Sequence, residues 1–295
     1  MTASPPVGII GLGLMGSALS ERMIAAGIAV VGYDTNLVKR EAFGRMGGKP
    51  ADTAARLIAD CETIMVSVFN ADQAEAVLGE ISAGAKPRLM ICTTTCAPDE
   101  IVRIARRAAE ASIAFIEAPI SGTSAEVRAG SAMTLIAGQA ETIAAAKPVF
   151  DAICSRQTIV GHIGDAAKTK LAINLILQSN RAALAEGIAF AESLGLDQAT
   201  FLATAKQSAA YSRVMDVKGD KMVTRDYAPQ SRIAQSLKDA ELILDQGERS
   251  GQPLPMTSVH ADLLRATIAR LGGECDSAAI IETLRPSQSR SGGAT

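Results

Sequence analysis

The stretch Val7-Gly-Ile-Ile-Gly11-Leu-Gly13-Leu-Met-Gly16 decides the fold, because a β-branched run leads directly into three spaced glycines. Helical spacing over Ser17–Ala26 follows them. In this setting Gly11 makes a tight turn, Gly13 lets the backbone approach a pyrophosphate, and Gly16 lets the helix pack closely on the strand. The N–H groups at the helix start favour bound phosphates. The pattern predicts a dinucleotide-binding loop, with an ordinary glycine-rich turn as the alternative.

An acidic residue stands where this kind of fold contacts the adenine ribose. The predicted strand Ala29–Tyr33 ends at Asp34. Its carboxylate can accept hydrogen bonds from ribose hydroxyls and repels a 2′-phosphate, which favours NAD. Lys39 and Arg40 could reach a phosphate, so NADP stays open, and a turn or N-cap role for Asp34 is the alternative. The expected cofactor-binding residues here are Gly11, Leu12, Gly13, Leu14, Met15, Gly16, Asp34, Thr35, Val68 and Phe69.

Strand-like and helix-like segments alternate through the first half of the chain. This repeated order predicts a mostly parallel sheet with helices on both faces. The expected strands are Val7–Ile10, Ala29–Tyr33, Thr63–Val68, Leu89–Thr93, Ile113–Glu117, Ala132–Ala137 and Thr158–Val160. The expected helices are Ser17–Ala26, Glu41–Met46, Ala54–Ala59, Ala71–Glu80, Asp99–Ala111 and Glu141–Ile153.

The pattern changes after Gly164, where one long helical stretch runs from Lys168 to about Leu194. We therefore expect an α/β Rossmann-like N-terminal domain and an all-α C-terminal domain, joined by a long interdomain helix. The expected domains are a dinucleotide-binding domain over 1–164, a helical substrate and dimerisation domain over 165–290, and a disordered tail over 291–295, within the Ser/Gly-rich end of the chain. The later helices are expected at Gln198–Ser208, Ser231–Glu248, Pro255–Leu271 and Ser277–Leu284.

Composition limits the class of protein. The 295 residues suit two domains, and 48% hydrophobic with 20% charged residues is typical of a folded chain. A net charge of −2 gives no basic field for nucleic acid or an anionic membrane. The five cysteines are odd in number and widely spaced, which suits a reducing compartment better than a disulfide framework or a zinc site. No basic region precedes the first apolar run, which argues against a signal peptide, so we expect a cytoplasmic protein. The histidines have no partner at metal-ligand spacing, so we expect no metal.

Five segments stand in the order and at the approximate distances of the motifs of one family. They are Gly11–Gly16, Thr93-Thr-Thr95-Cys-Ala-Pro98, Glu117-Ala-Pro-Ile-Ser121-Gly122-Thr123, Gly161–Asn174 and Leu237-Lys238-Asp239. Together they resemble the β-hydroxyacid dehydrogenases, which include 3-hydroxyisobutyrate dehydrogenase and tartronate semialdehyde reductase. The resemblance implies cofactor contacts at Thr95 and Lys238, a substrate-binding segment at Ser121, Gly122 and Thr123, and a catalytic pair, Lys170 and Asn174, that also binds substrate.

This chain departs from the family pattern at several of those positions. Cys92 and Glu117 stand where the family usually has Asp, and Thr123 replaces a second Gly. Ile173 replaces the first residue of an Asn pair, and Ala166 replaces a Gly. None of these positions lies in the glycine loop, so they bear on the substrate more than on the class of reaction.

Lys170 and Asn174 lie four residues apart on the predicted long helix, which places them on one face, one turn apart. The first turns of that helix are expected to face a cleft between the domains. In hydride transfer Lys170 would be the general acid or base at the substrate oxygen, and Asn174 would orient the substrate. A solvated lysine and a structural asparagine are the alternatives.

The resemblance implies an NAD(P)-dependent 3-hydroxy acid dehydrogenase or semialdehyde reductase. Its expected substrate is a small carboxylate-bearing alcohol or aldehyde, and its expected assembly is a homodimer or homotetramer. An imine reductase on the same fold is one alternative, although such enzymes generally lack a lysine at the position of Lys170. A non-catalytic dinucleotide-binding protein is the other, because fold alone does not decide function.

Overall fold

The computed structural model describes residues 5–83 and 89–285 of the chain. It divides into two compact units, Met1–Leu171 and Ala172–Thr295. The predicted tail over 291–295 lies outside the described residues. The division falls inside the long helix α9 (Asp165–Ser193), which begins directly after residue 164, the end of the predicted first domain.

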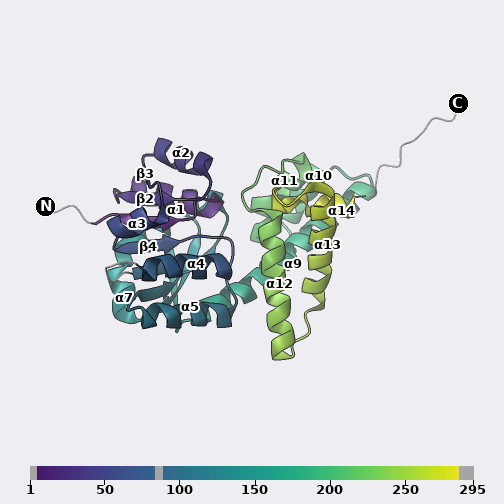
Figure 1. Cartoon of the computed structure of the whole chain (residues 1–295). Coiled ribbons are helices and arrows are strands. Elements are labelled where there is room, and N and C mark those ends of the chain that lie inside the picture. Colours follow the sequence, from purple (N-terminus) through teal and green to yellow (C-terminus); the bar gives the residue numbers. More distant parts are fainter. Residues whose placement is uncertain (1–4, 84–88, 286–295) are drawn as a thin grey trace. The chain divides into compact units, whose positions relative to one another are not determined.

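The first unit is built around one sheet of nine strands, in the order β3-β2-β1-β4-β5-β6-β8-β7, with β9 paired to β8 (Figure 1). The neighbours from β3 to β6 run parallel, β8 runs antiparallel to β6 and β7, and β9 runs parallel to β8. The prediction of a mostly parallel sheet is confirmed. The strands are β1 (Val7–Ile10), β2 (Val30–Tyr33), β3 (Lys49–Pro50), β4 (Thr63–Val66), β5 (Leu89–Cys92), β6 (Ala114–Glu117), β7 (Ile120–Ser121), β8 (Met133–Gly138) and β9 (Arg156–Gly161).

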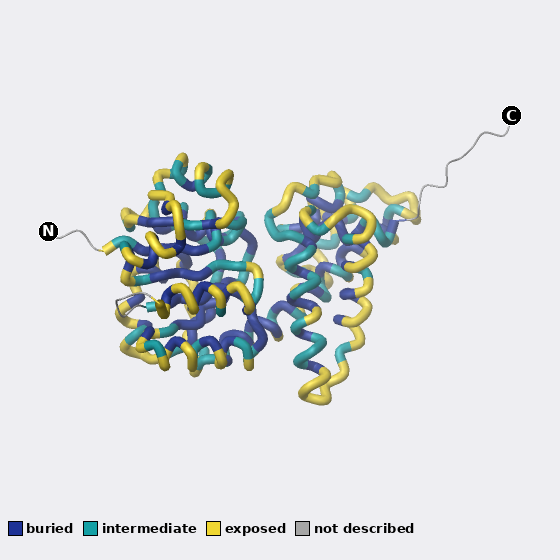
Figure 2. The backbone as a smooth tube through the Cα atoms, in the orientation of Figure 1, coloured by how far each residue is buried: buried dark blue, intermediate teal, exposed yellow. Residues whose placement is uncertain are grey.

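Helices cover both faces of the sheet, and each face has its own apolar core. Leu19 of α1 and Phe43 of α2 belong to one core, and Leu57 of α3 and Leu78 of α4 belong to the other. Figure 2 shows the strands as buried segments between helices whose outer sides are exposed. The helices of this unit are α1 (Leu14–Ala25), α2 (Leu37–Arg45), α3 (Ala54–Asp60), α4 (Ala71–Ser82), α5 (Pro98–Glu110), α6 (Ser124–Arg128), α7 (Ala140–Ala145) and α8 (Lys147–Ile153).

Two helix predictions in this unit are wrong in extent. The single helix expected over Glu141–Ile153 is two helices, because Pro148 starts α8 and cannot continue the hydrogen-bond ladder of α7. Helix α2 begins at Leu37, four residues before the predicted start, because the Asn36 side chain accepts hydrogen bonds from the N–H groups of Val38 and Lys39. The short elements β3, β7 and α6 carry too little periodicity to be predicted.

The second unit is helical throughout its described part. It contains α10 (Gln198–Ala205), a π-turn (Met215–Gly219), α11 (Asp220–Thr224), α12 (Ile233–Ser250), α13 (Pro255–Leu271), a 3₁₀ turn (Ser277–Ile280) and α14 (Ile281–Leu284). The predicted helix Ser277–Leu284 is therefore a 3₁₀ turn that continues into α14. The structure describes no helix in this chain long and apolar enough to cross a membrane.

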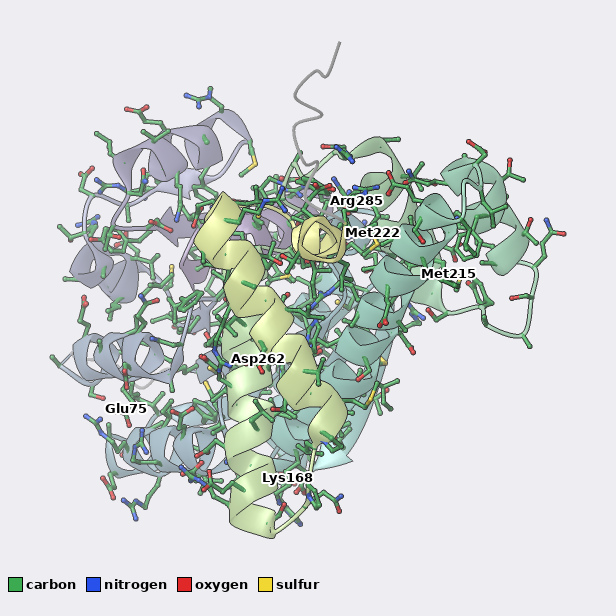
Figure 3. The ribbon with its side chains drawn as sticks, turned by 90° about the vertical axis from the view of Figure 1, so that its right-hand side faces the viewer. Glu75, Lys168, Met215, Met222, Asp262 and Arg285 are labelled. Atoms are coloured by element: carbon green, nitrogen blue, oxygen red, sulfur yellow. The ribbon has the colours of Figure 1, made fainter. Side chains whose placement is uncertain are left out.

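Buried Arg285 ties three helices of the second unit together. Its Nε donates to Glu192 of α9 at 2.8 Å, and its Nη2 donates to the carbonyl of Met222 in α11 at 3.1 Å. It also pairs with Glu282 of α14. Figure 3 labels Arg285 and Met222 where these segments meet. Because the guanidinium has five donors, one side chain can hold this many partners.

The three glycines after β1 have different surroundings. Gly11 has a φ of 99°, and a Cβ there would lie 2.2 Å from the Ser67 carbonyl oxygen. A Cβ on Gly16 would lie 1.9 Å from the Gly11 carbonyl oxygen, whereas a Cβ on Gly13 would meet no described atom within 4 Å. Gly11 and Gly16 are therefore required by the fold itself, and Gly13 leaves space in front of the loop.

These surroundings predict opposite effects for two matched substitutions. Gly16→Ala should lower the free energy of unfolding by about 1–3 kcal/mol or more, because the new methyl group overlaps a backbone carbonyl. Gly13→Ala should cost less than about 1 kcal/mol in stability. It should nevertheless weaken dinucleotide binding about tenfold or more, because the methyl group projects into the space in front of the loop. Urea unfolding and fluorescence titration measure the two quantities. Equal loss of stability in both variants would contradict the assignment.

Candidate active site

The parallel strands of the first unit end along one edge of the sheet. The last residues of β1, β2 and β4 are register partners, since Ile10 lies opposite both Tyr33 and Val66. The ends of β5 and β6 continue this edge, where Cys92 lies opposite Val66 and Glu117. Ligands of open α/β sheets bind outside such carboxyl ends. The predicted cofactor residues that follow these strands are Gly11, Leu12, Gly13, Leu14, Met15, Gly16, Asp34, Thr35, Val68, Phe69 and Thr95.

The start of α1 fits a phosphate group. Its N-cap is Gly13, which provides no side chain to cap the helix, and its first turn holds no acidic residue. Leu12 is buried, whereas Leu14 and Met15 are half-buried. The positive end of the helix dipole is therefore not offset by a local carboxylate, and the space in front of Gly13 suits the pyrophosphate of a dinucleotide.

Asp34 is 9% exposed and is held by the glycine loop. Its Oδ2 accepts from the N–H of Leu12 at 2.8 Å, and its Oδ1 accepts from the N–H of Asn36 at 2.9 Å. Asp34 thus has a turn role as well, while the N-cap of α2 is Asn36. These bonds fix the carboxylate beside the loop, where the ribose of a bound dinucleotide would lie. Thr35, the next residue, is exposed.

The two cations that could reach a 2′-phosphate have other partners. The Lys39 Nζ lies 3.3 Å from the Asp34 Oδ2. The Arg40 Nη1 donates to the carbonyl oxygen of Asp52 at 2.7 Å, and its guanidinium carbon lies 5.5 Å from the centre of the Tyr33 ring. Lys39 therefore pairs with the Asp34 carboxylate itself, and Arg40 is held by the loop at Asp52.

Thr94 joins the loops that follow β4 and β5. Its hydroxyl accepts from the N–H of Val68 at 3.1 Å and lies 3.3 Å from the Val68 carbonyl oxygen. Thr95, which the sequence favoured, is half-buried, and Phe69 is 44% exposed. The positioning role of Thr94 was not predicted, because the three successive threonines give no local signal that separates them.

The expected substrate segment forms a turn and a helix start. Ser121 ends β7, and Gly122 has a φ of 145°, a conformation that favours glycine. The N–H of Thr123 donates to the Glu126 Oε2 at 2.9 Å, and the Thr123 hydroxyl accepts from the N–H of Glu126 at 3.2 Å. This capping box uses the polar groups of Thr123 to start α6. Thr123 therefore supports the loop that carries Ser121 and Gly122.

Glu117 connects the sheet edge to the start of α9. Its side chain is 1% exposed, and its Oε2 accepts from the N–H of Gly164 at 2.6 Å. Burial, and to a smaller extent the charge of Asp165, raises the pKa of Glu117 to about 7. The nearby N–H groups of Gly164, Ala166 and Ala167 act against this rise. The sequence marked Glu117 only as a residue that stands where the family usually has Asp, and its bond to the start of α9 was not predicted.

Lys170 belongs to the first unit and lies one turn after these N–H groups. It is 7% exposed, so the solvated-lysine alternative does not hold. Lys168, labelled in Figure 3, is exposed and pairs with Asp165 at 3.1 Å, as expected for a residue on another side of the helix. The two neighbouring lysines therefore have different environments, and Lys170 has the environment typical of a functional group.

Asn174, in the second unit, is oriented by an ion pair on α12. Its Nδ2 donates to the Asp239 Oδ2 at 3.0 Å, and the Lys238 Nζ lies 3.0 Å from the Asp239 Oδ1. An ionised carboxylate only accepts hydrogen bonds, so the Asn174 amide must turn its NH₂ group toward Asp239. The amide oxygen then remains as an acceptor. Lys238 and Asp239 are mostly buried, which argues against a simple surface pair.

The polar face of α9 continues beyond Asn174. Gln178 and Arg181 follow at helical spacing, and both are buried. The Gln178 Nε2 donates to the carbonyl oxygen of Ser236 at 3.2 Å, and the Arg181 Nη2 lies 3.5 Å from the His260 Nε2. Burial and Arg181 lower the pKa of His260 to about 3. In residues 5–83 and 89–285, no group of three His, Cys, Asp or Glu side chains is arranged to hold a metal ion.

The raised pKa of Glu117 predicts how stability depends on pH. A carboxyl whose pKa rises from 4.5 to about 7 on folding binds its proton more tightly in the native state. Its contribution to stability is therefore lost as the pH rises through this interval, by about 3 kcal/mol in total. Glu117→Gln cannot titrate. Its free energy of unfolding, relative to the original chain, should increase by about 3 kcal/mol between pH 4.5 and pH 8.

Urea unfolding of both proteins at several pH values measures this difference. The hydrogen bonds lost in Glu117→Gln change the free energy of unfolding by an amount that does not depend on pH. The prediction is therefore tested by how the difference between the two proteins changes with pH. A difference that stays flat from pH 4.5 to pH 8 would show that Glu117 titrates normally.

Two family models together match nearly the whole chain. The NAD binding domain of 6-phosphogluconate dehydrogenase matches residues 6–164. The NAD-binding domain of NADP-dependent 3-hydroxyisobutyrate dehydrogenase matches residues 164–284. Both matches agree with the fit of the glycine loop and Asp34 to a nicotinamide dinucleotide.

Individual proteins are similar over almost their full length. L-threonate dehydrogenase of Cupriavidus necator is 31% identical over 93% of this chain and 94% of its own. 2-Hydroxy-3-oxopropionate reductase of Escherichia coli is 27% identical over 94% and 96%. The crystal structure of 3-hydroxyisobutyrate dehydrogenase from Salmonella typhimurium has a TM-score of 0.88 at 24% identity, over 95% of this chain and 99% of its own. An imine reductase from Pseudomonas shares the fold with a TM-score of 0.65 at 21% identity, over 96% and 100%.

The first family model alone covers more than half of the chain, and the threonate dehydrogenase is a full-length relative above 30% identity. On this evidence the chain belongs to the β-hydroxyacid dehydrogenase family.

Proposed function

We propose that this protein is an NAD(P)-dependent oxidoreductase that interconverts a small β-hydroxy acid and its semialdehyde. One observation carries the proposal. Lys170 is buried about one turn after the start of α9. The start of that helix is hydrogen-bonded to Glu117, which lies at the same edge of the sheet as the glycine loop. A buried amine near that edge is suited to move a proton at a substrate oxygen.

Bound NADH or NADPH would supply the hydride to the carbonyl carbon of the semialdehyde. The Lys170 ammonium donates a proton to the carbonyl oxygen as the alcohol forms. In the oxidation direction the neutral Lys170 amine accepts the hydroxyl proton. Lys170 therefore acts as general acid in one direction and general base in the other. After reduction the neutral amine regains a proton from water, and after oxidation the ammonium returns its proton to water, so Lys170 is unchanged over each turnover.

The remaining polar groups would orient the substrate. The Asn174 amide oxygen, left as an acceptor by Asp239, accepts from a substrate hydroxyl. The Ser121 hydroxyl and the backbone N–H of Gly122 donate to the substrate carboxylate. Lys238, paired with Asp239, is proposed as a cofactor contact because the family resemblance implies one there. Such orientation matters because a misplaced substrate reacts much more slowly.

The substrate class follows from the same groups and from the relatives. A carboxylate site at Ser121 and Gly122 together with a hydroxyl site at Lys170 and Asn174 suits a short hydroxy acid. Relatives of this chain are named for L-threonate, 2-hydroxy-3-oxopropionate and 2-(hydroxymethyl)glutarate. We propose a substrate of this kind, a short carboxylic acid whose β carbon carries the hydroxyl group or is the aldehyde carbon.

A homodimer or homotetramer remains our proposal for the assembly. Ile176 and Phe190 on α9 and Leu194 directly after it are each at least 60% exposed. Exposed large apolar side chains on one helix are typical of an interface between copies of a chain.

Replacement of Lys170 should remove the chemical step without removing cofactor binding. Lys170→Ala should lower kcat about 10²-fold or more, the usual contribution of a positioned general acid. Its dissociation constant for the dinucleotide should change less than about twofold. Reduction of short aldehyde acids is followed by nicotinamide absorbance, and binding by fluorescence titration.

Lys168→Ala is the matched control, because Lys168 is exposed and pairs only with surface Asp165 among the contacts described here. It should leave kcat unchanged. Full activity in Lys170→Ala would refute the proposed role, and absence of turnover by the original chain on every aldehyde acid would favour an imine substrate or a non-catalytic binder.

We also propose that NAD is preferred over NADP. The Asp34 carboxylate is fixed beside the loop, and Lys39 and Arg40 have other partners. Asp34→Asn should lower kcat/KM for NADH by about tenfold to a hundredfold, the usual worth of hydrogen bonds to a charged group, while NADPH is used better than before. Asp60→Asn, which removes a more exposed carboxylate, is the control. A higher kcat/KM for NADPH in the original chain would contradict the proposal.

A further inference from the structure

We propose that Glu117 is a positioning residue for Lys170: its buried carboxylate binds the first turn of α9 to the end of β6 and so sets where the lysine amine lies. The inference rests on the proposed function, in which Lys170 transfers the proton. It assigns a task to a residue that touches neither cofactor nor substrate in that mechanism.

The contact joins two distant segments through one side chain. Glu117 and Gly164 are 47 residues apart in sequence, and the Glu117 Oε2 lies 2.6 Å from the Gly164 N. The nearby N–H groups of Ala166 and Ala167 also favour the charged form of this carboxylate. The first N–H groups of a helix have no partner inside it, so the carboxylate satisfies that of Gly164 and meets the positive end of the helix dipole.

A second carboxylate at the start of α9 does not do this task. Asp165 accepts from the N–H of His162 at 3.0 Å and pairs with Lys168. It is exposed, and it binds the helix to the loop directly before it. Glu117 instead binds the helix to the sheet. Asp165 therefore caps the helix locally, and Glu117 attaches it to the edge of the sheet where the cofactor is proposed to bind.

The geometry makes Lys170 sensitive to this attachment. Ala167 precedes Lys170 by three residues, a rise of about 4.5 Å along the helix. A shift or fraying of the first turn therefore moves the lysine directly. Displacement of a reacting group by about 1 Å can lower a rate about 10²-fold. A fixed first turn is accordingly worth more to the reaction than to the fold.

The chain keeps this carboxylate although burial makes its charged form unfavourable. Its Oε1 is buried and has no hydrogen-bond partner among the described residues. The titratable groups that face it are Asp165 from α9 and the Cys92 thiol from β5. Neither offers it a positive charge, and burial raises its pKa to about 7. Residues that lower stability at a site are often retained for function.

The test compares Glu117→Gln and Glu117→Asp with the original chain. Hydrogen exchange of peptides that cover residues 163–170 reports directly on the N–H groups of Gly164, Ala166 and Ala167. We expect this exchange to be at least tenfold faster in Glu117→Gln, with smaller change in Glu117→Asp, which keeps a carboxylate. Asp197→Asn is the control, since Asp197 caps the separate helix α10. It should leave exchange over 163–170 unchanged.

Kinetics give the second readout. Glu117→Gln should lower kcat at least tenfold, while KM for the dinucleotide changes less than twofold, and Glu117→Asp should recover part of kcat. The original chain should also lose kcat below about pH 7, as Glu117 gains a proton and releases the helix. That limb of the pH profile should be absent in Glu117→Gln.

The inference and the proposed function fail in different ways. If Glu117→Gln keeps both kcat and slow exchange over 163–170, Glu117 does not position Lys170. If Glu117→Gln fails to fold, Glu117→Asp decides: exchange and kcat equal to those of the original chain overturn the inference, because a side chain one methylene shorter draws the carboxylate back from the Gly164 N–H. If the original chain turns over no hydroxy acid while Glu117→Gln still speeds exchange, the proposed function fails and the attachment of α9 stands.

Discussion

The common edge at which the parallel strands end is the constraint on which the first unit depends. The register that sets Ile10 opposite Tyr33 and Val66 brings three separate loops together. The left-handed turn at Gly11 then directs the chain into α1 without a side chain in the way. Asp34 and Thr94 tie the neighbouring loops to each other through backbone N–H groups. The result is a rigid set of donors and acceptors before any ligand binds, which reduces the cost of ordering them.

Attachment of α9 extends this constraint to the proposed proton donor. A carboxylate at the end of β6 replaces a solvent or ligand partner for the first turn of the helix. The cost is a buried charge whose pKa is raised to about 7. The benefit is a fixed start for the helix that carries Lys170. In the second unit, Asp239 has a comparable effect on Asn174, since it fixes which way the amide faces. In the proposed mechanism each of the two candidates, Lys170 and Asn174, is oriented by a carboxylate that does not react.

Local patterns predicted much of this arrangement. Spaced glycines and alternating apolar runs predicted the turn into α1 and the parallel sheet, and an acid after the second strand marked the residue that bonds to that turn, because each depends on residues close in sequence. Lys170 and Asn174 could be placed on one helix face for the same reason. Family resemblance, more than spacing, singled them out from other polar residues on the helix. The sequence therefore indicated which elements of the first unit carry the candidate residues, and their roles stay predictions.

Other features depend on contacts between distant residues. The bond from Gly164 to Glu117 and the bond from Asn174 to Asp239 span 47 and 65 residues. The periodic spacing of apolar residues does not indicate which distant residues will form such hydrogen bonds. The break between α7 and α8 was missed because apolar spacing continues across Ala146, although Pro148 gave a local signal. The role of Thr123 in a capping box was also missed, even though Glu126 stands at the spacing that such a motif requires.

The proposed reaction moves a hydride directly from the dinucleotide to the substrate, and an isotope label on the dinucleotide can follow that hydride. The protein would be incubated with NADH carrying deuterium at C4 of the reduced ring and with a short aldehyde acid in ordinary water. Nuclear magnetic resonance of the product then locates the label. Deuterium should appear on the new carbinol carbon, because the hydride passes from the ring to the substrate without exchange with water. Product without deuterium from either C4-labelled form of the cofactor, or bound cofactor with no reduced product from any aldehyde acid, would contradict it.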